Sequence, residues 1–144
     1  MSTPEVVVTG LGMTTPVGGD VAASWSAILA GQSGVRPIDA EWIAEQPSRI
    51  AGQLAVEPSE VLTKVETRRL DRSQQAAVIA AREAWQDAGA PAVEPERLGT
   101  VIGTGIGGVT SLLEAYDTLN AVSYTHLRAH ETVLDLVCRL LLEK

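Results

Sequence analysis

The same order of features occurs twice in this chain of 144 residues: a short apolar run, a glycine-rich turn and a helical pattern. The first apolar run covers residues 5–9 and ends at Gly10-Leu11-Gly12, and the second covers residues 98–103 and leads into further glycines. Continuous apolar runs are typical of strands covered on both faces, as in parallel sheets. The alternation therefore predicts an α/β fold of three layers with a mostly parallel sheet.

Three segments have the apolar spacing of helices. The first follows Asp20, which can cap a helix that Gly31 would end. The second runs from about residue 71 to residue 88, before Gly89, and the third follows Gly108 and continues through Leu119. Residues 32–62 contain three prolines, so we expect a loop-rich stretch there without long regular elements.

Charge and composition exclude several classes of function. The net charge is −7, and residues 1–121 hold 15 acidic against 8 basic residues. Without a basic cluster, binding to nucleic acid or to an anionic membrane surface is not expected. No apolar stretch is long enough to span a bilayer, and a single cysteine permits no internal disulfide, so we expect a cytoplasmic protein. Phe is absent, which predicts a core of small and branched aliphatic side chains.

The second glycine turn, residues 103–108, satisfies the pattern G-x-G-x-x-G after an expected strand and before an expected helix. Such a turn can receive a pyrophosphate on its backbone N–H groups. A dinucleotide site also needs an acidic residue at the end of the next strand, and none follows. The same glycines could instead permit close packing and a sharp exit from the strand. The turn at residues 10–15 matches the pattern less well.

The end of the chain carries the other reactive side chains. His126, His130 and Cys138 have a spacing that a three-ligand metal site could use, but Cys138 lies in an apolar helical stripe, which is typical of a buried and inert thiol. We therefore predict no metal site. Asp71, at the start of the second helical pattern, is predicted to stabilise a helix N-terminus and to have no part in catalysis.

Several motifs taken in order resemble the opening of β-ketoacyl-acyl-carrier-protein synthases, and most closely the elongating type II enzymes. They are residues 6–12, Thr14-Thr15-Pro16-Val17-Gly18, residues 30–35, Arg69-Leu70-Asp71-Arg72 and residues 101–108. The resemblance implies part of a thiolase-like fold, namely an incomplete N-terminal half. It also implies a homodimer that takes malonyl groups from acyl-carrier protein and elongates acyl chains by decarboxylative condensation in fatty-acid or polyketide biosynthesis.

The resemblance covers residues 6–121, so residues 1–121 are predicted to form the partial synthase domain. It assigns the Cys-His-His set of the family to a region beyond these residues, so no residue here is given a catalytic role and the chain is predicted to be inactive. Ile106 matches an isoleucine that lines the acyl pocket, and no cofactor is implied. Residues 122–144 resemble translated sequencing-adapter read-through and are predicted to be a non-native tail. A dinucleotide-binding oxidoreductase fragment and a non-catalytic α/β interaction module are the alternatives.

Overall fold

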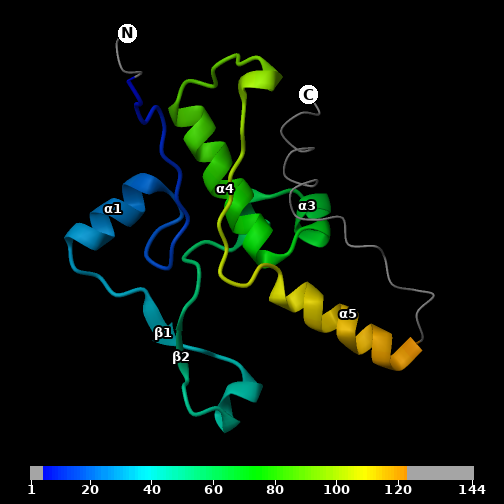
Figure 1. The fold of residues 1–144 in the computed structure, drawn as a ribbon. Coiled ribbons are helices and arrows are strands. Elements are labelled where there is room, and N and C mark those ends of the chain that lie inside the picture. Colours follow the sequence, from blue (N-terminus) through cyan, green and yellow to red (C-terminus); the bar gives the residue numbers. More distant parts are fainter. Residues whose placement is uncertain (1–4, 123–144) are drawn as a thin grey trace. The chain divides into compact units, whose positions relative to one another are not determined.

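A computed structural model describes residues 5–122. The chain divides into two compact units, and the division falls between Val78 and Ile79 inside helix α4 (Arg72–Asp87). The first unit is formed by Met1–Val61 and Ile79–Pro91, and the second by Leu62–Val78 and Ala92–Lys144. Figure 1 labels the main elements of both units. The remaining elements, in chain order, are α1 (Val21–Leu29), β1 (Val35–Pro37), the 3-10 helix η1 (Glu41–Glu45), β2 (Ile50–Gly52), α2 (Pro58–Val61), α3 (Lys64–Arg69), η2 (Pro95–Arg97) and α5 (Val109–Val122).

The three predicted helices are confirmed as α1, α4 and α5. Helix α1 begins after Asp20, whose Oδ1 accepts a hydrogen bond from the Ala23 amide at 2.7 Å. Gly31 follows this helix with a φ of 67°, and Gly89 follows α4 with a φ of 81°. Glycine adopts this left-handed conformation without the steric cost of a Cβ, which is why both helices end where the sequence predicts.

Helix α3 was not predicted from the sequence. A capping box begins it, in which the Thr63 hydroxyl accepts a hydrogen bond from the Glu66 amide and the Glu66 carboxylate accepts one from the Thr63 amide. At its other end, the buried Gln75 side chain donates to the Thr67 and Leu70 carbonyl groups at 3.0 and 2.8 Å. Polar side chains therefore bind the free backbone groups at both ends of this short helix.

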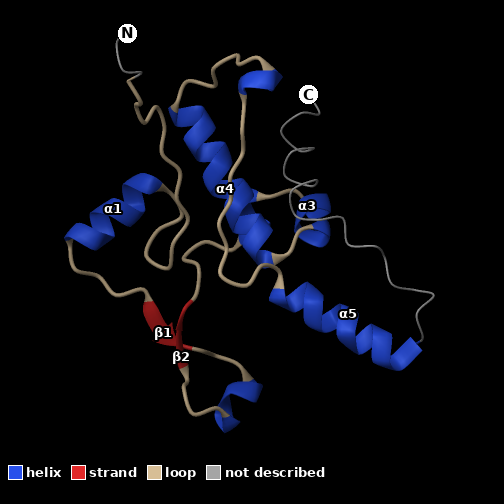
Figure 2. Cartoon of the chain, viewed as in Figure 1, coloured by secondary structure: helices blue, strands red, loops and turns tan. Residues whose placement is uncertain are grey.

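The two predicted parallel strands are wrong for the structure as described. Residues 5–9 and 98–103 form no strand, and within residues 5–122 the only sheet is the antiparallel pair of β1 and β2, drawn in red in Figure 2. Val35 pairs with Gly52 and Pro37 with Ile50 in that sheet. An apolar run forms a strand only where a neighbouring backbone completes the hydrogen-bond ladder. Neither run has such a neighbour here, and Val6 and Val101 are 92% and 97% exposed.

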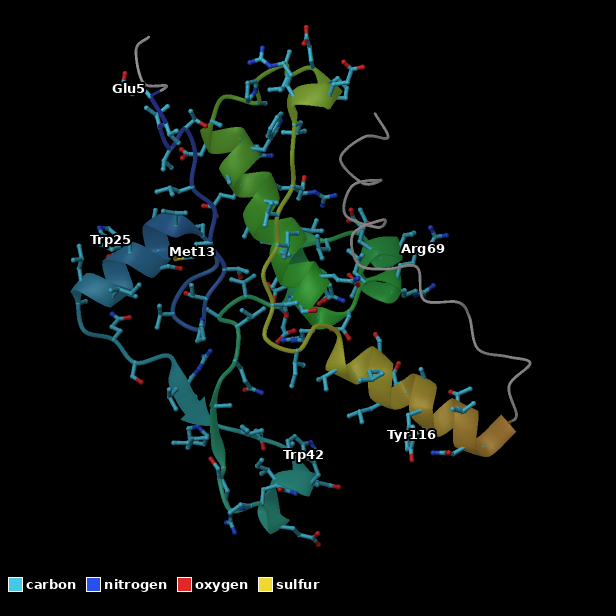
Figure 3. The ribbon with its side chains drawn as sticks, in the orientation of Figure 1. Glu5, Met13, Trp25, Trp42, Arg69 and Tyr116 are labelled. Carbon is cyan, nitrogen blue, oxygen red and sulfur yellow. The ribbon has the colours of Figure 1, made fainter. Side chains whose placement is uncertain are left out.

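The buried apolar side chains are aliphatic, as the composition predicts. Within the described residues they are Ala27, Pro58 and Ile79 in the first unit, and Leu62, Leu70 and Val78 in the second. The Trp25, Trp42 and Tyr116 rings are exposed and project from their helices in Figure 3. In the part of the chain that the structure describes, no helix is both long and apolar enough to cross a membrane.

Candidate functional site

The first glycine turn lies directly against the backbone of helix α4. A Cβ built on Gly12 would overlap the Ala80 carbonyl oxygen and would lie 2.6 Å from the Ala84 nitrogen. A Cβ on Gly10 would lie 2.7 Å from the Ala88 nitrogen. The three alanines are four residues apart and share one face of the helix. The two glycines are therefore required for close packing on α4.

Two carboxylates of α4 bind the backbone N–H groups around this turn. Glu83 accepts hydrogen bonds from the Met13 amide at 2.7 Å and from the Val21 amide at 2.9 Å, through different oxygens. Asp87 accepts one from the Leu11 amide at 2.9 Å. A phosphate group would need these donors and would be repelled by both carboxylates. This turn is consequently not an anion site.

A carboxylate, that of Asp71, also binds backbone next to the second glycine turn, but Cβ atoms built on Gly103, Gly105 and Gly107 would meet nothing within 4 Å, so close packing does not explain these three glycines. Asp71 Oδ2 accepts hydrogen bonds from the Ser111 amide at 3.1 Å and from the Ser111 hydroxyl at 2.9 Å. Ser111 lies in the first turn of α5, at the point where a G-x-G-x-x-G motif would hold a pyrophosphate. A Cβ on Gly108 would lie 2.9 Å from Asp71 Cγ. The chain's own carboxylate thus occupies the position that a dinucleotide would need.

Asp71 also caps its own helix, as the sequence predicts. Its Oδ1 accepts a hydrogen bond from the Ser73 amide at 3.2 Å, and its own amide donates to Gln74 Oε1 at 2.8 Å. Burial of the Asp71 carboxyl raises its pKa, but the hydrogen bonds from Ser73 and Ser111 outweigh this effect and the pKa lies below its ordinary value. The carboxylate is therefore bound by the first turns of both α4 and α5.

This pKa shift predicts a pH dependence of stability. The pKa of an unfolded aspartate is about 3.9, and the folded pKa of Asp71 is lower. The stabilisation by Asp71 is then complete above about pH 5, where the unfolded aspartate is also ionised, and is lost as the pH falls through the folded pKa. Urea unfolding followed by far-ultraviolet circular dichroism should show a stability difference between the wild type and Asp71→Asn that is constant from pH 5 to pH 8 and shrinks below pH 4. A difference that persists unchanged at pH 3 would contradict this assignment.

The remaining predicted site residues are not brought together. Ile106 lies at the tip of the second turn with 79% of its surface exposed. His126, His130 and Cys138 lie outside the described residues, so the predictions about metal binding and thiol chemistry there stay predictions. Residues 5–122 contain no group of three side chains that could hold a metal ion. Glu83 and Asp87, which bind the first turn, were not singled out from the sequence.

Comparison with known proteins identifies the family. The model of the β-ketoacyl synthase N-terminal domain matches residues 3–133, which is most of the chain. The chain belongs to the β-ketoacyl synthase family. This is a family of condensing acyltransferases.

Individual relatives of this β-ketoacyl synthase chain agree with the family match. It is 41% identical over 120 residues to the 3-oxoacyl-[acyl-carrier-protein] synthase 2 of Mycobacterium leprae, covering 82% of this chain and 29% of that protein. It is 39% identical over 122 residues to the enzyme of the same name from Coxiella burnetii, covering 83% and 30%.

A solved structure described as the ishigamide ketosynthase/chain length factor superposes with a TM-score of 0.59 at 28% identity, covering 90% of this chain and 32% of that one. The chain therefore shares the ketosynthase fold over most of its length and spans under a third of the length of these relatives. The family match and this superposition confirm the predicted thiolase-like fold class. The two strands predicted at residues 5–9 and 98–103 are not formed.

Proposed function

We propose that this chain supplies the opening section of an elongating β-ketoacyl-acyl-carrier-protein synthase of fatty-acid or polyketide biosynthesis. The observation that carries the proposal is the family match over residues 3–133, together with 41% identity to a 3-oxoacyl-[acyl-carrier-protein] synthase 2. The surroundings of the glycine turns argue against a dinucleotide site, because Glu83 and Asp87 accept hydrogen bonds from amides of the first turn and Asp71 accepts one from Ser111, in the first turn of α5 after the second. A dinucleotide-binding oxidoreductase has no such support.

The proposed reaction is a decarboxylative Claisen condensation. An acyl group is held as a thioester on a cysteine, the malonyl thioester of acyl-carrier protein loses carbon dioxide, and the resulting carbanion attacks the acyl carbonyl carbon. A carbon–carbon bond forms, the carbon–sulfur bond to the enzyme breaks, and the thiolate is released. Preorganised hydrogen-bond donors stabilise the charge on the thioester oxygen. No cofactor takes part in this sequence.

In this proposal the described residues provide scaffold and part of the acyl pocket. Ile106 is the pocket residue, and its exposed position at the tip of the second turn leaves its side chain free to contact an acyl chain. Residues 1–121 supply no catalytic cysteine or histidine, and in this proposal residues 122–144 take no part. We further propose a cytoplasmic homodimer with acyl-carrier protein as its partner, and no turnover by the 144-residue chain alone.

A chimeric enzyme tests the proposal directly. Residues 1–121 would replace the segment they match in the 3-oxoacyl-[acyl-carrier-protein] synthase 2 of Mycobacterium leprae, a segment that makes up 29% of that protein. Because the segment acts as scaffold, we expect the chimera to extend acyl groups with malonyl-acyl-carrier protein at a rate within about tenfold of the parent, or about 1.4 kcal/mol in activation free energy. Product formation would be measured by mass spectrometry of the carrier-bound chains.

Two controls separate this function from the alternatives. The 144-residue chain alone should form no extended product and should not bind NAD or NADP in calorimetric titrations. A chimera that is folded and dimeric but has no condensing activity would contradict the proposal. Micromolar binding of either dinucleotide would favour the oxidoreductase instead.

A further inference from the structure

The glycine turn that carries Ile106 has few contacts that fix its position. Cβ atoms built on Gly103 and Gly105 would meet nothing within 4 Å. Within the turn, the Gly107 amide donates to Thr104 Oγ1 at 3.0 Å. The Ile106 side chain is 79% exposed. Because packing does not hold the turn, its position depends on how its ends are attached.

One end of the turn is attached through Asp71. The Leu112 amide donates to the Gly108 carbonyl oxygen at 3.0 Å, so the turn runs directly into the first turn of α5. The Ser111 amide and hydroxyl bind Asp71 Oδ2 at 3.1 and 2.9 Å. The built Cβ of Gly108 would lie 2.9 Å from Asp71 Cγ, so glycine is also needed for this approach. The carboxylate of Asp71, the residue before α4, therefore holds the start of α5.

Asp71 is itself held in one orientation. Its amide donates to Gln74 Oε1 at 2.8 Å, and its Oδ1 accepts a hydrogen bond from the Ser73 amide at 3.2 Å. Gln75, four residues after Asp71, is buried. Its side-chain amide donates a hydrogen bond to the Leu70 carbonyl oxygen, at the end of α3, at 2.8 Å. One oxygen of Asp71 thus faces its own helix and the other faces α5, which makes the side chain a fixed link between the two helices.

We propose that Asp71 is a positioning residue that sets the place of Ile106, and with it the acyl-chain selectivity of the synthase, without contacting the acyl chain itself. This inference rests on the proposed function. The aspartate holds the N-terminus of α5, the N-terminus of α5 holds Gly108, and Gly108 ends the turn that carries Ile106. Removal of the carboxylate would free that end of the turn and let Ile106 take several positions.

The first test uses the 144-residue chain with labelled isoleucine methyl groups. In Asp71→Ala, NMR relaxation should show greater mobility of the Ile106 methyl group, and the Ser111 amide should exchange about tenfold faster because its acceptor is lost. Ser111→Ala removes only the hydroxyl hydrogen bond to Asp71 and should increase the mobility of Ile106 less. Asp71→Asn keeps an acceptor oxygen and should be intermediate. The matched control is Asp20→Ala, which removes a helix cap in the first unit, where Asp20 accepts a hydrogen bond from the Ala23 amide. It should leave Ile106 unchanged.

The second test uses the chimeric enzyme and short and long acyl substrates. Asp71→Ala should change the ratio of kcat/KM between the two chain lengths by about tenfold or more, while Asp20→Ala should leave this ratio unchanged. An Ile106 methyl group that is equally rigid in Asp71→Ala and the wild type would overturn the proposal, as would an unchanged ratio. Failure of the unsubstituted chimera to elongate would count against the proposed function alone, because the NMR result does not depend on activity.

Discussion

Replacing Gly12 by alanine is expected to destabilise the first unit by about 3 kcal/mol or more, at the upper end of the range for overpacking. The new Cβ would overlap the Ala80 carbonyl oxygen and lie 2.6 Å from the Ala84 nitrogen. Both atoms belong to the backbone of α4, so neither can move aside as a flexible side chain would. The segment around Gly12 would have to leave the helix and give up the hydrogen bond from the Met13 amide to Glu83.

Tryptophan fluorescence during urea unfolding measures this effect. Trp25, Trp42 and Trp85 are the three tryptophans of the chain, and all lie in the first unit. The control in the same unit is Gly31→Ala. Gly31 has a φ of 67° and no atom within 4 Å of a built Cβ, so this change introduces backbone strain alone and should cost about 1 kcal/mol. Equal destabilisation by the two changes would show that close packing at Gly12 does not matter.

The helices could be predicted from the sequence because their signals are local. Asp20 and Gly31 lie at the two ends of α1, and Gly89 follows α4, so the stop and start signals sit within a few residues of the element that they define. Helix α3 has an equally local signal, Thr63 followed three residues later by Glu66, and could have been found from its capping box. It is only six residues long and directly follows the proline-containing stretch that the sequence predicts to be loop-rich.

The strands could not be predicted in the same way, because a strand is defined by its partner. The apolar run of residues 5–9 has the composition of a buried strand, yet Val6 is 92% exposed and the run pairs with nothing in the described structure. Strand β1 is only three residues long and contains Pro37, but it pairs with β2 and forms the sheet. Composition indicates which runs can form strands, and only the neighbouring backbone decides which of them do.

At the candidate site, the role of the two glycine turns also depends on residues that are distant in the sequence. Each motif is compatible with a phosphate or with close packing, and the residues that decide between these lie far away in the sequence. Glu83 is 70 residues from Met13, and Asp71 is 40 residues from Ser111. Acidic residues on the helix that packs against a glycine turn are the signal that would have favoured packing, but without the fold their proximity could not be known.

Replacing Glu83 by alanine is the second change expected to have a large effect. Its two oxygens accept hydrogen bonds from the Met13 amide at 2.7 Å and the Val21 amide at 2.9 Å, and Val21 is the first residue of α1. One side chain therefore binds both the glycine turn and the positive end of a helix. Leaving a buried N–H group without an acceptor costs about 1–3 kcal/mol. Both amides are partly buried and water can reach them in part, so we expect a total loss of about 2 kcal/mol.

The glutamine variant separates the hydrogen bonds from simple loss of side-chain volume. Glu83→Gln keeps the shape and one acceptor oxygen but places an NH₂ group against the other amide, so it should lose roughly half of the stability lost in Glu83→Ala. Glu114→Ala, an exposed glutamate of α5 in the second unit, should change the unfolding free energy by no more than about 0.5 kcal/mol. If Glu83→Gln were as stable as the wild type in urea unfolding followed by tryptophan fluorescence, the two-amide role of Glu83 would be wrong. The turn would then be held by the glycine packing on α4 alone.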